Sequence, residues 1–332
     1  MSAANLRRPR TWSLLCAASS VVLSLASADA PAQPAFPQRT VQLVVPYTPG
    51  TGADILARTL APRLAQRWKT AVITENRPGA SGNIGAEVVA KAAPDGHTLL
   101  FAATSFATNP AVNRNLPFDP IRSFSPVVLL ATSALALIAS PTVPAQSLRE
   151  FIDLAQKEPG RLHYSSPGNG TSQHFAMELL KLEANIDLVH VPYKGLGGGL
   201  QDLVGGHVQA MVSALQTAAP QVQAGKVRML AVMGPERSPL FPKVPTMKEQ
   251  GFADLVIETW YAVFAPGGTP PDLLERLNTD LNGVLGEPEV REQVERQGLT
   301  PAGGARDRLG SLVRSELVRW GRVSASARIK AD

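Results

Sequence analysis

The chain has 332 residues, of which 44% are hydrophobic and 5% aromatic, and its formal net charge at pH 7 is +5. Nucleic-acid binding proteins typically carry a basic stripe with interleaved aromatic residues, and this sequence has none. We therefore expect no nucleic-acid partner. A chain of this length usually fills two hydrophobic cores instead of one, so we expect two lobes.

The N-terminal segment has the features of a secretory signal peptide. Three arginines within residues 7–10 precede a mostly apolar run, 14–25, that ends in small residues. The run is shorter than the ~20 residues of a membrane-spanning helix. We predict that residues 1–28 are removed after Ala28, with Ala32 as the alternative, and that the mature protein is periplasmic. The arginine pair leaves twin-arginine export open beside the general route.

Removal of this segment changes the charge and the cysteine content. It carries three arginines and no acidic residue, so the formal net charge falls from +5 to +2. The sole cysteine, Cys16, also lies there, so the mature chain has no disulfide and no thiol chemistry. The histidines in or beside predicted strands lack metal-like spacing. We expect neither a metal site nor a cofactor.

Short apolar runs alternate with helical patterns in the first part of the chain. Strands are predicted at 41–46, 71–76 and 97–103, and helices at 53–68 and 83–93. This alternation predicts a parallel sheet with right-handed crossovers. The rhythm restarts at Leu162 with strands in LHYSS, IDLVHVPY, HVQAMVSA and KVRMLAVM and helical segments between them, so we predict a second α/β unit.

Two long apolar passages, 127–140 and 256–270, resemble each other and indicate that the chain crosses between the lobes twice. The C-terminal helices predicted at 271–285, 288–297 and 307–325 are then expected to return to the first lobe. The predicted fold is a two-lobed α/β protein. Its lobe 1 comprises residues 36–138 and 258–332, and its lobe 2 comprises residues 139–257.

A glycine-rich elbow, VVPYTPGTGADILART (44–59), joins a predicted strand to a helix. Such a turn presents backbone N–H groups at the positive end of the helix dipole, which favours an anion. It lacks the P-loop pattern. A dinucleotide fingerprint is disfavoured because Ile55 replaces the third glycine, although Glu75 stands where a ribose-binding acid would. The glycines could also only shape a tight turn.

The elbow has two counterparts. TSFATNP (104–110) and SSPGNGTSQH (165–174) also follow predicted strands, the second in the other lobe. Ligands of open α/β sheets bind beyond the carboxyl ends of the strands. We therefore predict a cleft in which polar strand exits from both lobes face one another.

The sequence resembles the periplasmic substrate-binding proteins of tripartite tricarboxylate transporters, the Bug receptors. The resemblance covers essentially the whole mature chain. It is carried, in order, by VVPYTPGTGADILAR, ENRPGASGNIGAEVVAKAAPDGHTLLF, YSSPGNGTSQH, VHVPYKG, DLVGGHV, AGKVRMLAV and FPKVPTMKEQG. It implies a venus-flytrap fold of the type II kind with two crossovers. It also implies a monomer that captures a small carboxylate for a membrane permease, without catalysis.

The resemblance implies ligand contacts at fifteen positions. They are Tyr47, Thr48, Thr51, Gly52, Ala53, Asp54, Ser105 and Thr108 in lobe 1, and Ser166, Gly168, Asn169, Gly170, Thr171, His174 and Ser213 in lobe 2. Asp54 is interpreted as a cap or dipole partner that orients the elbow. His174 is either a ligand contact or a capping residue, and Lys194 either pairs with a distal ligand carboxylate or is a solvated turn residue. A branched side chain at Gly52 is expected to enter the anion's seat.

Three departures from the family pattern affect the ligand. The elbow reads GTGAD (50–54) where a run of glycines before Thr-Asp is usual, and 196–199 forms a glycine-rich rim. Ser213 occupies a position that is often Asp, which could hold a ligand ammonium group. The sequence therefore favours a plain mono-, di- or tricarboxylate over an amino acid.

Two other functions stay open. An exported hydrolase or oxidoreductase acting on a small carboxylate could use an exposed serine, although Gly-x-Ser-x-Gly and His-Glu-x-x-His motifs are missing from the sequence. A receptor that presents its ligand to a signalling partner is the third interpretation.

Overall fold

The computed structural model describes residues 1, 36–113 and 115–327. The chain divides into two units, Met1–Phe36 and Pro37–Asp332. Residues 2–28 of the predicted signal peptide and both of its candidate cleavage sites lie outside the described residues. The fold given below is that of the second unit.

The first α/β unit follows the predicted alternation. Its elements are β1 (Val41–Val45), α1 (Gly52–Trp68), β2 (Val72–Asn76), α2 (Asn83–Ala90), β3 (Thr98–Ala103) and α3 (Ser105–Thr108). Strand β1 lies parallel between β2 and β3, with Val41 opposite Val72 and Gln42 opposite Thr98. The carboxyl ends of β1 and β3 therefore meet at one edge of this first sheet.

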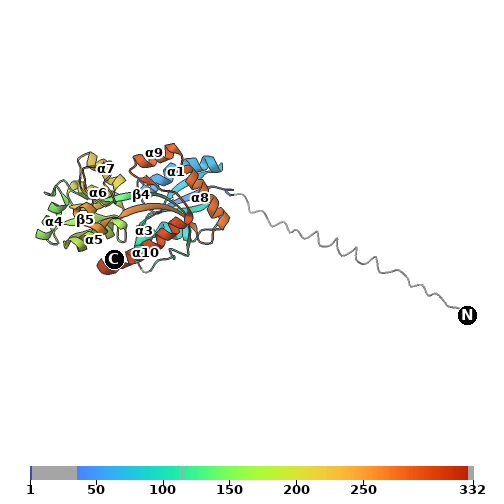
Figure 1. Ribbon diagram of the computed structural model, residues 1–332, viewed down its shortest axis with the longest axis horizontal. Helices are drawn as coiled ribbons and strands as arrows, with labels where there is room; N and C mark the ends of the chain where they lie inside the picture. The colour runs from blue at the N-terminus through green and yellow to red at the C-terminus, as the bar shows by residue number, and fades with distance from the viewer. Residues whose placement is uncertain (2–35, 114, 328–332) are drawn as a thin grey trace. The chain divides into compact units, whose positions relative to one another are not determined.

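One long strand, β4 (Phe124–Ala139), belongs to two sheets (Figure 1). Its first part pairs antiparallel with β9 (Glu258–Pro266), and residues 135–139 pair antiparallel with β7 (Ala210–Ala214) and with β8 (Arg228–Val232). The first sheet has the order β2-β1-β3-β9-β4, with the short β10 (Thr300–Pro301) also on β4. The predicted two-lobed α/β fold with two crossovers is confirmed.

The second sheet continues from β4 through β7, β5 (His163–Ser166) and β6 (Val189–Pro192). Its helices are α4 (Leu148–Lys157), α5 (Ser172–Ala184), α6 (Leu196–Gly205) and α7 (Leu215–Gln223), and the C-terminal helices are α8 (Pro271–Leu285), α9 (Pro288–Arg296) and α10 (Arg306–Ala327). Short 3-10 helices lie at Ala80–Gly82, Asn109–Ala111, Lys248–Gln250 and Ala253–Leu255. Helix α4 was not predicted, although its N-cap, Ser147, accepts the Glu150 N–H at 3.2 Å in a recognisable Ser-x-x-Glu pattern.

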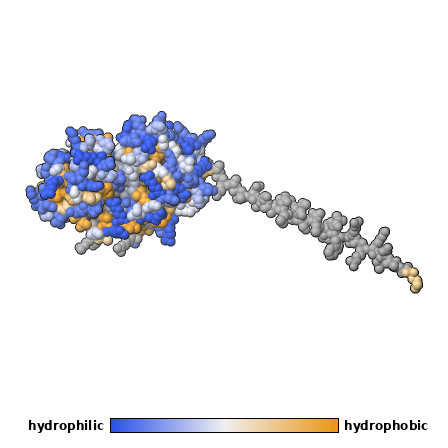
Figure 2. Space-filling view, in the orientation of Figure 1, coloured by the Kyte–Doolittle hydropathy of each residue, from blue (hydrophilic) through white to orange (hydrophobic). Residues whose placement is uncertain are grey.

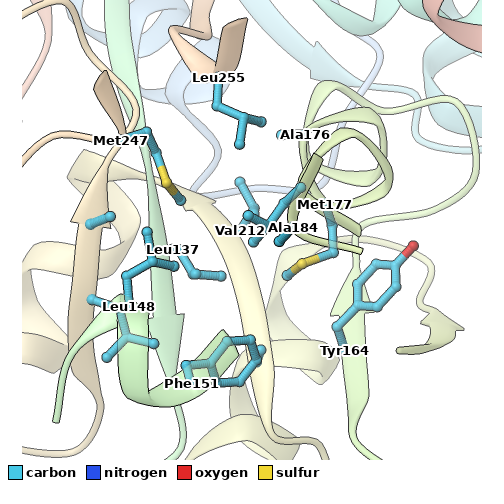
Figure 3. Close-up of a cluster of buried hydrophobic side chains, with 14 of the residues drawn as sticks. Leu137, Leu148, Phe151, Tyr164, Ala176, Met177, Ala184, Val212, Met247 and Leu255 are labelled. Atoms are coloured by element: carbon cyan, nitrogen blue, oxygen red, sulfur yellow. The ribbon is translucent and has the colours of Figure 1, made fainter. Parts of the chain in front are cut away.

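A buried apolar core fills the space beside the second sheet, and part of it, with Phe151, Tyr164 and Met177, is drawn in Figure 3. Trp320 of α10 joins this core and meets Phe175 of α5 edge-on, with ring centroids 5.2 Å apart. Helix α10 also contacts α3 of the first α/β unit, so it packs against helices that belong to both sheets' α/β units. The exact lobe boundaries remain a prediction.

The described part of the chain contains no helix that is both long and apolar enough to cross a membrane. The face seen in Figure 2 is mostly hydrophilic, with smaller hydrophobic patches between the polar residues.

Candidate functional site

A cavity of about 660 Å³ lies at the carboxyl ends of strands from both sheets. Its walls come from the loops after β1, β3, β5 and β6, from the end of β7, from the loop 78–82, and from Thr259 and Tyr261 of β9. This is the edge of an α/β sheet at which ligands bind. Three of the loops are the polar strand exits that the sequence singled out.

The elbow after β1 supplies five predicted residues to the wall: Tyr47, Thr48, Thr51, Gly52 and Ala53. Helix α1 begins at Gly52, and the Thr51 hydroxyl donates to the Thr48 carbonyl at 3.0 Å instead of capping the helix. The first N–H groups of a helix have no intrahelical acceptor. The N–H groups of Gly52 and Ala53 are therefore donors for an anion at this wall.

Asp54 does not line the cavity but fixes the elbow from behind. Its carboxylate accepts the Gly50 N–H at 2.9 Å, the Arg58 guanidinium at 3.0 Å and the Asn76 amide at 2.9 Å. Burial by itself raises the pKa of Asp54, but the hydrogen bonds from Arg58, Gly50 and Asn76 outweigh it and hold the pKa below its ordinary value. Asp54 is ionised and orients the turn.

The loop after β3 places one predicted residue at the cavity and one away from it. Ser105 lines the wall, and its Oγ lies 2.7 Å from the Tyr47 hydroxyl, which accepts the Ala103 N–H at 2.9 Å. Burial raises the pKa of Tyr47, so its hydroxyl stays protonated. Thr108 is buried behind the wall, and its hydroxyl donates to the Gly170 carbonyl.

The loop after β5 brings Gly168, Asn169 and Thr171 to the cavity. Thr171 is the N-cap of α5, since its hydroxyl oxygen accepts the His174 N–H at 3.3 Å. Ser166 lies behind this loop, where its Oγ accepts the Gly168 N–H at 3.1 Å and lies 2.6 Å from His190 Nε2. Like α1, α5 therefore begins at the cavity.

Three further predicted residues of the second sheet do not line the cavity. His174 turns inward: its Nδ1 accepts the Gly170 N–H at 3.2 Å, and its ring stacks on His190 with centroids 4.2 Å apart. Gly170 itself is buried behind the wall. Ser213 is fully buried in β7, while the next residue, Ala214, lines the cavity. Neighbouring strand residues face opposite sides, so only one of the two can reach it.

The sequence did not single out the loop 78–82, which closes one side of the cavity. Ala80 and Ser81 have φ values of 46° and 55°, which non-glycine residues seldom adopt. Ser81 Oγ donates to the Asn169 carbonyl at 2.6 Å, and Asn109 Nδ2 donates to the Ala80 carbonyl at 3.1 Å. The glycine-rich stretch RPGASGN was the available signal.

Tyr261 of β9 was also missed. A Cβ added at Gly52 would lie 2.4 Å from the Tyr261 hydroxyl oxygen and ring, and 2.7 Å from Gln216 Nε2. Any larger residue at this position must displace the Tyr261 or the Gln216 side chain. A side chain at Gly52 would meet Tyr261 first, and the expectation that it enters the anion's seat stays a prediction.

The described residues that line the cavity include one charged side chain, that of the exposed Lys194. The other polar side chains of the wall carry amides and hydroxyls. Tyr193, beside Lys194, donates its hydroxyl to Asp202, and burial together with that carboxylate raises the pKa of Tyr193 to about 12. The arrangement can hold an anion through neutral donors and two helix N-termini.

The comparisons with known proteins agree with this geometry. The model of the tripartite tricarboxylate transporter family receptor matches residues 56–328. BugT of Bordetella pertussis is 33% identical over 290 residues, which cover 87% of this chain and 89% of BugT.

Two solved structures have the same fold. A Rhodopseudomonas palustris protein solved with adipate is 34% identical with a TM-score of 0.85, and the match covers 90% of this chain and 100% of that one. MatC from the same organism, solved with bound malate, is 32% identical with a TM-score of 0.82, and the match covers 87% and 99% of the two chains.

Proposed function

Because this chain belongs to the tripartite tricarboxylate transporter receptor family, we propose that it binds a small carboxylate in the cavity and delivers it to the membrane subunits of a tripartite transporter. The bound adipate and malate of two similar structures support a carboxylate ligand. The predicted signal peptide supports a periplasmic location. Cell fractionation should then find the mature chain in the periplasm.

The observation that carries this proposal is that α1 and α5 begin at the same cavity. Helix α1 follows a strand of the first sheet, and α5 follows a strand of the second. Each helix N-terminus favours negative charge. A hydrogen bond to a charged group contributes about 1.5–3 kcal/mol, whereas micromolar affinity needs about 8 kcal/mol after the cost of association. Several donors from both sheets are therefore required together.

Two hydrogen bonds between loops of the two sheets link binding to closure. Ser81 donates to the Asn169 carbonyl, and Thr108 donates to the Gly170 carbonyl. A ligand that contacts loops of both sheets favours the arrangement in which these two hydrogen bonds form. Only in that arrangement can the ligand reach the donors of both sheets at once.

The composition of the wall supports binding without reaction. None of the described residues that line the cavity is Asp, Glu or His, the usual general bases. The Ser105 hydroxyl is hydrogen-bonded to Tyr47, which stays protonated, so this serine has no base beside it. An enzyme would need such a group within reach of its substrate.

The test is thermal unfolding with malate, with adipate, and with adipamide as a matched neutral control. We expect at least one acid to raise the melting temperature, since a ligand at 100 times its Kd stabilises the folded state by about 2.7 kcal/mol. Adipamide should have no effect, and nuclear magnetic resonance spectra should show the acid unchanged after incubation. Conversion of the acid to a product would favour the enzyme, and equal stabilisation by adipamide would exclude an anion site.

A further inference from the structure

The Tyr261 hydroxyl lies beside the N-terminus of α1. Tyr261 stands opposite Ala103 in the β3–β9 pair, lines the cavity, and is in contact with Gly52, the first residue of α1. It is therefore a side-chain oxygen at the place where Gly52 and Ala53 offer their N–H groups. Whether this oxygen donates or accepts a hydrogen bond there depends on its other partners.

Gln216 determines the direction of that hydrogen bond. The Ser133 hydroxyl donates to Gln216 Oε1 at 2.7 Å, so the amide nitrogen of Gln216 faces Tyr261 and donates to its oxygen at 2.6 Å. Ser133 is 2% exposed, so water does not compete for this contact.

A tyrosine oxygen has a single hydrogen to donate. With Gln216 donating to the oxygen, that hydrogen is available to an acceptor in the cavity that Tyr261 lines.

We propose that Tyr261 donates its hydroxyl hydrogen to the ligand carboxylate at the N-terminus of α1 and that Gln216 is the positioning residue that orients this donor. The inference rests on the proposed function, since it concerns the same ligand. It adds a ligand-binding residue from β9 to the backbone donors of the elbow.

The position of Gln216 makes this donor dependent on closure. Tyr261 belongs to the first sheet, whereas Gln216 is the second residue of α7, which directly follows β7 of the second sheet. Separation of the two sheets removes the Gln216 amide from Tyr261. The hydroxyl is then free to turn, so the ligand receives an oriented donor only in the closed arrangement.

The first test is the dissociation constant of Tyr261→Phe for malate and adipate, measured by calorimetry. Loss of one charge-assisted hydrogen bond should weaken binding about 10- to 100-fold. Tyr164→Phe is the matched control, since Tyr164 does not line the cavity and its hydroxyl is bonded to Glu178, and its Kd should change less than about 3-fold. A ligand-induced tyrosine difference spectrum in the near ultraviolet should be present in the unaltered protein and lost in Tyr261→Phe.

Gln216 is tested by two substitutions of similar length. Gln216→Glu places an acceptor beside Tyr261 and draws its hydrogen away from the cavity, whereas Gln216→Met removes the partner without reversing the bond. We expect Gln216→Glu to weaken binding at least 10-fold and Gln216→Met less than about 5-fold. Gln216→Glu is repeated in the Tyr261→Phe background to separate the added charge from the reversed bond.

The outcomes separate the inference from the proposed function. If the unaltered protein binds none of the acids, the proposed function fails and the inference fails with it. If it binds an acid and Tyr261→Phe binds equally well, Tyr261 is not a ligand donor. If Gln216→Glu costs the same with and without the Tyr261 hydroxyl, the positioning role of Gln216 is wrong.

Discussion

The buried Thr108 hydroxyl donates a hydrogen bond to the Gly170 carbonyl, and this contact joins the loop after β3 to the loop after β5. Thr108→Val keeps the shape of the side chain but leaves that carbonyl unpaired whenever the loops meet, which costs about 1–3 kcal/mol. We expect a roughly 5- to 150-fold weaker Kd for the bound acid in calorimetry. Thr108→Ser retains the hydroxyl and should bind nearly normally. Unaltered affinity in Thr108→Val would mean that this contact does not contribute to closure.

Gly52 and Gly50 differ in the space around them. A Cβ at Gly52 would lie 2.4 Å from Tyr261, whereas one at Gly50 has nothing within 4 Å. Gly52→Ala must displace Tyr261, and overpacking of this kind costs about 1–3 kcal/mol, so we expect a roughly 5- to 150-fold loss of affinity with the fold retained. Gly50→Asn is the control because asparagine tolerates the left-handed backbone at φ 82°. Equal affinities of the two variants would remove Gly52 from the site.

His174 holds the ligand-facing loop through its ring nitrogen. Its Nδ1 accepts the Gly170 N–H at 3.2 Å, so an acceptor is needed at that position. His174→Asn can place its side-chain oxygen there, whereas His174→Leu cannot and leaves a buried N–H unpaired, at a cost of about 1–3 kcal/mol. Urea unfolding should show the larger loss of stability for His174→Leu. If both variants are equally stable, the hydrogen bond to Gly170 is not what His174 contributes.

The stabilising effect of Asp54 should depend on pH. Its pKa is held below the ordinary value of 3.8, so its contribution to stability is complete above that pH and is lost as the pH falls through the lower, folded-state pKa. At pH 6 we expect Asp54→Asn to be less stable by about 1–2 kcal/mol, a figure reduced because Arg58 is half exposed.

Urea titrations at a series of pH values measure this difference. It should shrink as the pH falls below 3.8. A difference that stays constant or grows down to pH 2 would show that the Asp54 charge does not stabilise the elbow.

Elements that depend on local pattern could be predicted from the sequence. The alternation of apolar runs and helical patterns correctly predicted the strands around the elbow and the long shared strand, because parallel units repeat a local rhythm. The polar loops were found for the same reason, since each follows its own strand directly. Helix α4 was missed although Ser147 and Glu150 formed a readable N-terminal signal.

The rest of the cavity depends on pairing between distant segments. Tyr261 reaches Gly52 because the antiparallel register of β3 and β9 puts it opposite Ala103, and no spacing in the sequence reports that register. The choice between Ser213 and Ala214 depends on which face of β7 meets the cavity. The loops are held from behind by Asp54, His174 and Ser166. Residue type alone does not distinguish such a supporting residue from one that contacts the ligand.

A crystal structure of the protein with whichever of malate and adipate gives the larger thermal shift tests the central claim most directly. The account predicts an intact acid in the cavity, with a carboxylate oxygen within hydrogen-bonding distance of the Gly52 and Ala53 N–H groups at the start of α1. An acid bound elsewhere on the protein, or a reaction product in its place, would contradict it.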